Sequence, residues 1–192
     1  PPTGDWEQIF PIHAPSGYQT LALFGTDWYF YGGLRGSPTD YRSDVRKITL
    51  PDGTEIFIYT TGANPGARAH HFSAQNANKW WNFGGDDGSA GSTLADCYAF
   101  DPNDDTWTRC SDMPIALKDG AAAAFEAESV HILVFGGLQS DGNVSGRTFE
   151  YITEGEGAPP SQQAPEFSLI GLLALIGMVS VALAVAISRR RN

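Results

Sequence analysis

The side chains most suited to chemistry are two adjacent histidines and two pairs of aspartates. His70 and His71 are neighbours, and Asp86-Asp87 and Asp104-Asp105 lie in polar segments. Adjacent strand residues point to opposite faces, so the histidines cannot easily share a ligand, and packing and hydrogen bonding are their expected roles. Aspartate is favoured in turns, with calcium binding as the alternative. The sequence shows no nucleophile signature and no phosphate-binding loop, so it predicts no catalytic, cofactor-binding or metal-binding residues and no enzyme.

The two cysteines flank a predicted hairpin turn. Cys97 and Cys110 are the only cysteines, and the centre of the turn falls between Asn103 and Asp104. Symmetric pairing about that centre places Cys97 opposite Cys110, which makes a cross-strand disulfide feasible. The alternative is a pair of buried thiols. A disulfide would indicate an oxidising compartment.

One glycosylation sequon is present. Asn143-Val144-Ser145 lies in a polar segment between Gln139 and Gly146. The motif predicts glycosylation of Asn143 if the segment lies outside the cell, and an unmodified surface loop otherwise.

The elements that would position these side chains are indicated by a repeat. Aromatic or apolar runs end at three glycine pairs, which are Gly32-Gly33, Gly84-Gly85 and Gly136-Gly137. The pairs are 52 residues apart both times. A fixed period of about 40 to 50 residues is typical of repeat architectures such as the blades of a β-propeller. The glycines let the backbone leave each strand with positive φ or pass close to a neighbour.

The apolar pattern between turns predicts an all-β fold of twelve strands. Counted in phase with the glycine pairs, one strand is followed by groups of four, four and three, which makes about three four-stranded blades. The expected strands are 4–10, 18–24, 28–31, 43–50, 55–60, 68–74, 79–83, 94–100, 106–110, 120–126, 130–135 and 147–152.

The second unit resembles a kelch repeat. The resemblance is carried by Pro65-Gly66-Ala67-Arg68, Phe83-Gly84-Gly85, the run from Leu94 to Pro102, and Trp107. It extends less completely over residues 1–153, with Glu55 one period before Trp107 and Gly120 one period after Arg68. Kelch repeats fold as four-stranded propeller blades, so the resemblance implies that fold here.

Three blades are fewer than the four to eight of known propellers. Two explanations remain open: the chain is the C-terminal part of a longer propeller, or two copies share a ring of six blades. The start at Pro1-Pro2 without Met favours a missing upstream piece.

The C-terminal part predicts a membrane anchor. Residues 154–165 indicate a linker or stalk, 166–188 a transmembrane helix and 189–192 a cytoplasmic basic tail. The stretch 167–187 has no charge and would span roughly 30 Å as a helix. Arg189, Arg190 and Arg191 then place the C-terminus in the cytoplasm and the propeller outside the cell.

The start of this segment resembles the C-terminal sorting tails of prokaryotic surface proteins. The similarity rests on Pro165, Glu166 and Phe167, followed by the apolar stretch and the arginine cluster. Such tails are read by exosortase or archaeosortase enzymes, which implies cleavage and transfer to another anchor. A plain membrane anchor is the alternative.

The net charge and the loops after the glycine pairs indicate which partners the protein binds. Residues 1–166 hold all 22 acidic residues but only nine of the 12 basic ones, a formal charge of −13 that disfavours nucleic acid as a partner. We expect a non-enzymatic surface protein acting in adhesion, envelope scaffolding or a surface assembly. It would contact surface proteins or glycans through loops 34–42, 86–93 and 138–146, contact lipid through its helix, and self-associate if two copies complete a propeller. The alternatives are a carbohydrate-active propeller enzyme and an accessory membrane subunit.

Overall fold

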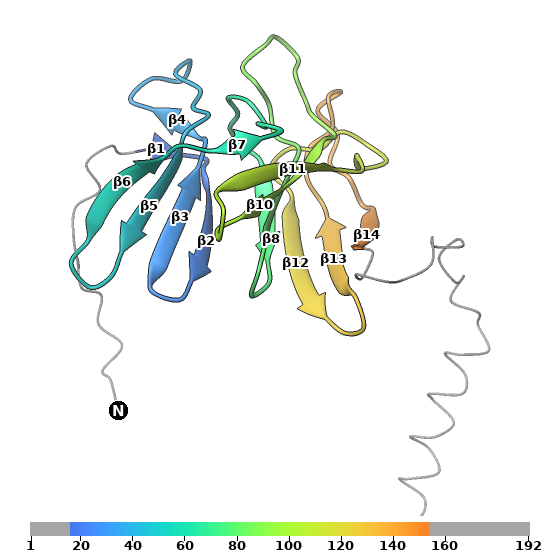
Figure 1. Ribbon diagram of the computed structural model, residues 1–192. Helices are drawn as coiled ribbons and strands as arrows, with labels where there is room; N and C mark the ends of the chain where they lie inside the picture. The colour runs from blue at the N-terminus through green and yellow to red at the C-terminus, as the bar shows by residue number, and fades with distance from the viewer. Residues whose placement is uncertain (1–15, 154–192) are drawn as a thin grey trace, which may run out of the picture. The chain divides into compact units, whose positions relative to one another are not determined.

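The computed structural model describes residues 16–153, which form antiparallel β-sheets joined by loops (Figure 1). The first sheet has the order β2-β3-β5-β6, with strands Thr20–Phe24, Asp27–Tyr31, Val45–Thr49 and Thr54–Ile58. The second has β8, β9, β10 and β11, which are Phe72–Gln75, Trp80–Phe83, Cys97–Asp101 and Thr106–Cys110. The third has β12, β13 and β14, which are Ala121–Glu126, Val130–Phe135 and Thr148–Ile152.

Three further strands have only two residues each. β1 (Ser16–Gly17) pairs with β4 (Leu34–Arg35) beside the first sheet. β7 (Thr61–Gly62) adds to the second sheet in parallel with β11, so the chain leaving the first sheet is tied directly to the outer strand of the next.

The first two sheets pack face to face through aromatic side chains. Because side chains alternate along a strand, each sheet turns one set of rings toward its neighbour. Tyr31 from the first sheet meets Trp107 from the second, with ring centroids 5.0 Å apart, and Phe100 lies 5.0 Å from the same Trp107. Trp80 is fully buried beside them. Such tilted and edge-on contacts stabilise the interface beyond the area they bury.

The second and third sheets share a separate core. Phe83, Leu117, Ile132 and Val134 are almost completely buried there, and Cys97 lies among them. Sheets one and two, and then two and three, therefore stack in chain order, with the innermost strands β2, β8 and β12 as neighbours.

The three glycine pairs occupy equivalent positions. Each pair directly follows the second strand of its sheet, and all six glycines have positive φ. A Cβ on Gly85 would lie 2.5 Å from the carbonyl oxygen of Ala69, and one on Gly33 would lie 2.5 Å from that of Gly17. The amide of Gly33 donates to the carbonyl of Arg68, and the amide of Gly85 to that of Leu117. At the first two pairs, one sheet is therefore bonded to the segment that leads into the next.

The repeat loses its 52-residue phase before the third sheet. Phe72 pairs with Phe83 in the second sheet, and Ala121 pairs with Phe135 in the third. The first strand has thus advanced by 49 residues while the glycine pair has advanced by 52. The expected correspondence of Gly120 with Arg68 is therefore wrong. Leu117 occupies the equivalent place, because the connection before it is three residues shorter.

Arg68 is a buried link within the second sheet. Its guanidinium binds Asp96 with two bonds of 2.7 and 2.8 Å and donates to the carbonyl oxygen of Gly84 at 3.0 Å. It also donates to the carbonyl of Pro65. A buried charge that is paired through two bonds in this way is stable in a core, whereas removing one partner leaves the other uncompensated.

The cysteines form a disulfide in the predicted register. Cys97 and Cys110 are direct partners in the β10–β11 hairpin, with Cα atoms 5.0 Å apart. The expected symmetric pairing about the turn is confirmed.

The described segment is all-β, in agreement with the predicted fold class. Within residues 16–153 no helix is long and apolar enough to cross a membrane. The expected strand 4–10, linker 154–165, helix 166–188 and tail 189–192 lie outside the described residues.

Gly85→Ala is predicted to destabilise the fold by about 3 kcal/mol, because the methyl group meets a backbone carbonyl and the positive φ is strained as well. Gly91→Ala is the matched control, because Gly91 also has positive φ but has no atom within 4 Å of its Cβ position. Its cost is expected to be about 1 kcal/mol. Urea unfolding of both variants measures the difference, and equal losses would contradict the close-approach account.

Replacing both cysteines by alanine is predicted to lower the free energy of unfolding by about 3 kcal/mol, because the crosslink no longer restricts the unfolded chain. The comparison is urea unfolding of the oxidised wild type, the reduced wild type and the double variant. The last two should have similar stabilities. A double variant as stable as the oxidised protein would contradict a structural role for the disulfide.

Candidate functional site

The loops that follow the glycine pairs lie on one side of the sheets. Loops 34–42, 86–93 and 138–146 project at the top of Figure 1, beyond the ends of the strands. Loops held by a rigid sheet scaffold commonly carry recognition. The expected contact loops are therefore brought to a common face, although their binding role stays a prediction.

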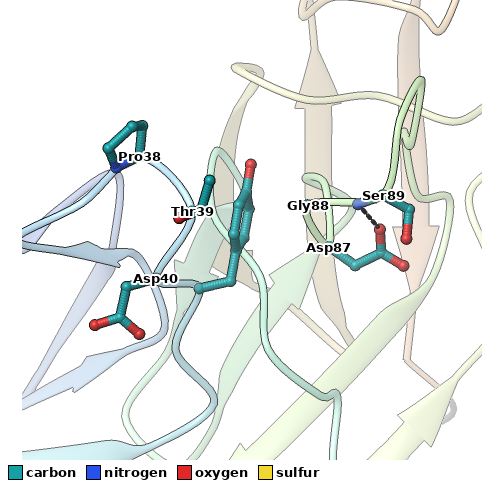
Figure 2. A pocket seen from close by; sticks show the side chains of 7 residues that line it. Pro38, Thr39, Asp40, Asp87, Gly88 and Ser89 are labelled. Atoms are coloured by element: carbon teal, nitrogen blue, oxygen red, sulfur yellow. Dashed lines mark hydrogen bonds between the residues drawn. The ribbon is translucent and has the colours of Figure 1, made fainter.

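The first two loops enclose a polar hollow. It has a volume of about 400 Å³ and is lined by Pro38, Thr39, Asp40, Tyr41, Asp87, Gly88 and Ser89. Figure 2 shows residues 38–40 of the first loop facing residues 87–89 of the second across this space. Hydroxyl and carboxylate groups line most of it, so it suits a ligand that donates hydrogen bonds or carries positive charge.

Tyr41 joins the two loops. A Cβ on Gly88 would lie 2.8 Å from the Tyr41 ring, so the ring packs directly on the Gly88 backbone. A hydrogen bond to the carboxylate of Asp86, together with burial and the charges of Asp86 and Asp87, raises the pKa of Tyr41 to about 12. The phenol therefore stays protonated at physiological pH.

The carboxylates of Asp40 in the first loop and Asp87 in the second are held by different interactions. Arg42 lies 3.5 Å from Asp40 and donates to Asp44 at 2.8 Å, which restrains the first loop. Hydrogen bonds from Ser92 and Ser89 lower the pKa of Asp87. Both carboxylates remain at the surface as acceptors of the hollow.

Asp86 ties the second loop to the third sheet. It is only 5% exposed, its backbone exchanges two hydrogen bonds with Ala69, and its Oδ2 accepts from the ammonium group of Lys118 at 3.2 Å. The paired ion is partly buried, so the contact helps to fix the loop and is screened less than a surface pair.

The two neighbouring histidines have separate environments, although they do not lie in the expected strand 68–74: β8 begins only at Phe72, and His70 has a left-handed backbone. His71 is buried and its Nε2 lies 2.9 Å from the hydroxyl of Thr20. Burial, reinforced by the charge of Arg68, lowers the pKa of His71 to about 3, so the ring is a neutral packing element. His70 instead lies 2.8 Å from Asp119 at the loop side of the sheets.

The other predicted site residues fall in different places. Trp107 is buried in the core between the first two sheets. Asn143 is exposed in the third loop, where its amide group donates to Asp141 at 2.9 Å. Pro165, Glu166 and Phe167, and the arginines at 189, 190 and 191, lie outside the described residues. Among residues 16–153 no group of three or more His, Cys, Asp or Glu side chains is arranged to hold a metal ion.

Comparison with known families identifies a kelch motif at residues 83–114. The matched segment begins at Phe83, the end of β9, and continues through the disulfide-linked hairpin of β10 and β11. No curated protein matches the chain. Kelch domains generally mediate protein–protein interactions, which agrees with the loop face as the place to look for function.

The pKa of Tyr41 leads to a prediction at high pH. The folded state keeps the Tyr41 proton up to about pH 12. The unfolded state loses it near the ordinary tyrosine pKa of about 10, so its contribution to stability is complete below about pH 10 and declines between about 10 and 12. Urea midpoints measured from pH 9 to 12 should fall more steeply for the wild type than for Tyr41→Phe. Parallel curves would contradict the Tyr41–Asp86 interaction.

Proposed function

We propose that this chain is a non-enzymatic binding protein that takes up a partner protein on the face formed by loops 34–42, 86–93 and 138–146. The observation that carries the proposal is the polar hollow between the first two loops. Two equivalent loops of successive sheets build it jointly, and Tyr41 packs across from one to the other. The kelch motif at residues 83–114 supports a protein partner.

The chemistry of the hollow favours a partner surface with lysine or arginine. Asp40 and Asp87 belong to opposite loops, and the hydroxyl groups of Thr39 and Ser89 are further acceptors in the lining. Residues 1–166 also carry a formal charge of −13, so the long-range field attracts a basic partner and speeds its approach.

The cellular setting is proposed from the disulfide and the C-terminal sequence. The Cys97–Cys110 bond fits an oxidising compartment, and the sequon at Asn143 lies on the loop face. The uncharged stretch 167–187 and the arginines after it support a single-pass anchor with the sheets outside the cell. Adhesion, envelope scaffolding or membership of a surface assembly is then the proposed role, with the Pro165-Glu166-Phe167 segment as its sorting signal.

Exposed apolar residues on the outer faces of the first and third sheets favour a propeller with more blades than these three sheets. Leu21, Leu23 and Phe57 are about half exposed on the face of the first sheet that points away from the second. Phe125 and Ile152 are similarly exposed on the far face of the third sheet. Apolar patches of this kind mark surfaces that other elements cover. Further blades of a longer chain and a second copy of this chain both fit them.

A second candidate function is a carbohydrate-active enzyme. The observation in its favour is the pair of His70 and Asp119, in which a carboxylate orients an imidazole on the loop side. This is the arrangement that a general base requires.

The binding proposal is tested with short synthetic peptides of matched length that are rich in Lys and Arg, rich in Asp and Glu, or uncharged. The full chain is expected to bind the basic peptides selectively. Asp40→Asn combined with Asp87→Asn should weaken that binding about tenfold at low salt, because two charge contacts are lost.

The matched control combines Asp104→Asn with Glu128→Gln. These residues are exposed in hairpin turns at the opposite ends of the strands, and the change in charge is the same. Their removal should leave peptide affinity within twofold. No selectivity for basic peptides, or equal losses in both double variants, would contradict a partner site in the hollow.

A further inference from the structure

Three residues on the loop side share an unusual backbone conformation. Tyr18, His70 and Asp119 have φ angles of 58°, 59° and 53°, in the left-handed region that glycine adopts most readily. Each stands two residues before the first strand of its sheet, β2, β8 or β12. They are three of the four non-glycine residues with positive φ between residues 16 and 153. The fold therefore places a large or polar side chain, three times in succession, where glycine would be least strained.

Backbone hydrogen bonds set these residues side by side. The amide of His70 donates to the carbonyl oxygen of Tyr18 at 3.2 Å, and the amide of Asp119 donates to that of His70 at 2.8 Å. The side chains follow the same order. The rings of Tyr18 and His70 stack with centroids 4.0 Å apart, and Nδ1 of His70 lies 2.8 Å from a carboxylate oxygen of Asp119. The three sheets thus present one continuous row of side chains.

The row leaves an unused hydrogen-bonding atom on the imidazole. In the neutral ring, the carboxylate of Asp119 accepts from Nδ1–H, so Nε2 carries the lone pair. Within the described part of the chain, no hydrogen bond of His70 uses Nε2. The imidazole is therefore oriented by Asp119 with Nε2 ready to accept a hydrogen bond from a ligand.

Tyr18 supplies an apolar surface beside that atom. Tyr18 is 59% exposed, and its ring is held by stacking on His70. It also lines a shallow hollow of about 300 Å³ with Gly17, Leu34, Gly36, Ser37 and Pro38. Apolar lining with a few placed polar groups is the usual composition of a small-molecule site.

A sugar has both features that this surface requires. One face of a pyranose ring is formed by C–H groups that pack on an aromatic ring, and its edge carries hydroxyl groups that donate hydrogen bonds. We propose that Tyr18, His70 and Asp119 form a carbohydrate-binding site, in which the sugar packs beside Tyr18 and a hydroxyl group donates to Nε2 of His70. The Asp119 carboxylate and the acidic surroundings select a neutral sugar over an acidic one. The hollow beside Tyr18 adjoins the polar hollow at Pro38, but Tyr18, His70 and Asp119 do not line the polar hollow, and the site does not depend on the peptide-binding proposal.

The chain contains a matched set of side chains in a different setting. Phe125 stacks on His131 with centroids 4.8 Å apart, and Nδ1 of His131 lies 2.9 Å from Glu150. These residues repeat the aromatic, imidazole and carboxylate groups on the extended strands β12, β13 and β14. They serve as a control for non-specific attraction of sugars to an exposed ring and histidine.

The experiment uses the full 192-residue chain in a sugar-free detergent on an array of neutral hexose, N-acetylhexosamine and uronate oligosaccharides. The strongest neutral binder is then titrated calorimetrically against variants. Tyr18→Gly and His70→Gly remove the side chains without opposing the left-handed backbone, and each should weaken binding at least tenfold. Asp119→Asn, which keeps the shape of the side chain, should weaken it at least threefold. Phe125→Ala and His131→Gln should change it less than twofold.

Binding of the lysine- and arginine-rich peptides distinguishes a failure of the carbohydrate site from a failure of the peptide-binding proposal. All three site variants should bind those peptides as the wild type does, which also reports that they are folded. Binding of no neutral sugar on the array, or equal sugar affinity in the wild type and the glycine variants, overturns the carbohydrate site while leaving the peptide proposal standing. Cleavage of the bound sugar that His70→Gly abolishes would support the site and overturn the non-enzymatic function.

Discussion

The structure depends on the close approach of backbones at the glycine pairs. At each pair the chain leaves the second strand of a sheet with positive φ, and at the first two pairs an amide bonds the segment that leads into the next sheet. A Cβ at Gly32 would lie 2.7 Å from the carbonyl oxygen of Arg68, and one at Gly84 would lie 2.1 Å from that of Leu117, so only glycine permits these distances between a sheet and the segment before the next. Successive sheets stack because of this contact, and the loops that follow the pairs project to one side as a result.

The remaining interactions hold the stacked sheets rigidly together and so fix the positions of the loops that follow the glycine pairs. Aromatic rings dominate the space between the first two sheets, and aliphatic and aromatic side chains together with the disulfide fill the next space. Arg68 holds Asp96 and the carbonyl of Gly84 from inside the second sheet. The polar hollow and the Tyr18–His70–Asp119 row are each built from more than one sheet, so their geometry depends on how firmly the sheets are held.

Local pattern was enough to predict much of the scaffold, but not the sites that arise between sheets. The glycine pairs, the apolar runs and the turn between the cysteines are short-range signals, so the strands and the disulfide register could be derived from them. The relation of Tyr18 to His70 follows the 52-residue period, but Asp119 lies 49 residues after His70 because the connection before it is shorter. That shift hid the row and led to Gly120, instead of Leu117, as the counterpart of Arg68. The contact of Tyr41 with Gly88 is purely tertiary and leaves no mark in the sequence.

Amide hydrogen exchange of Gly33 and Gly85, followed by NMR, tests the central claim most directly. If these amides bond adjacent sheets together, they should open only when the sheets separate and exchange as slowly as the amides of β9. Exchange as fast as that of Gly91, which lies in an open loop, would contradict an account in which the glycine pairs hold the stack together.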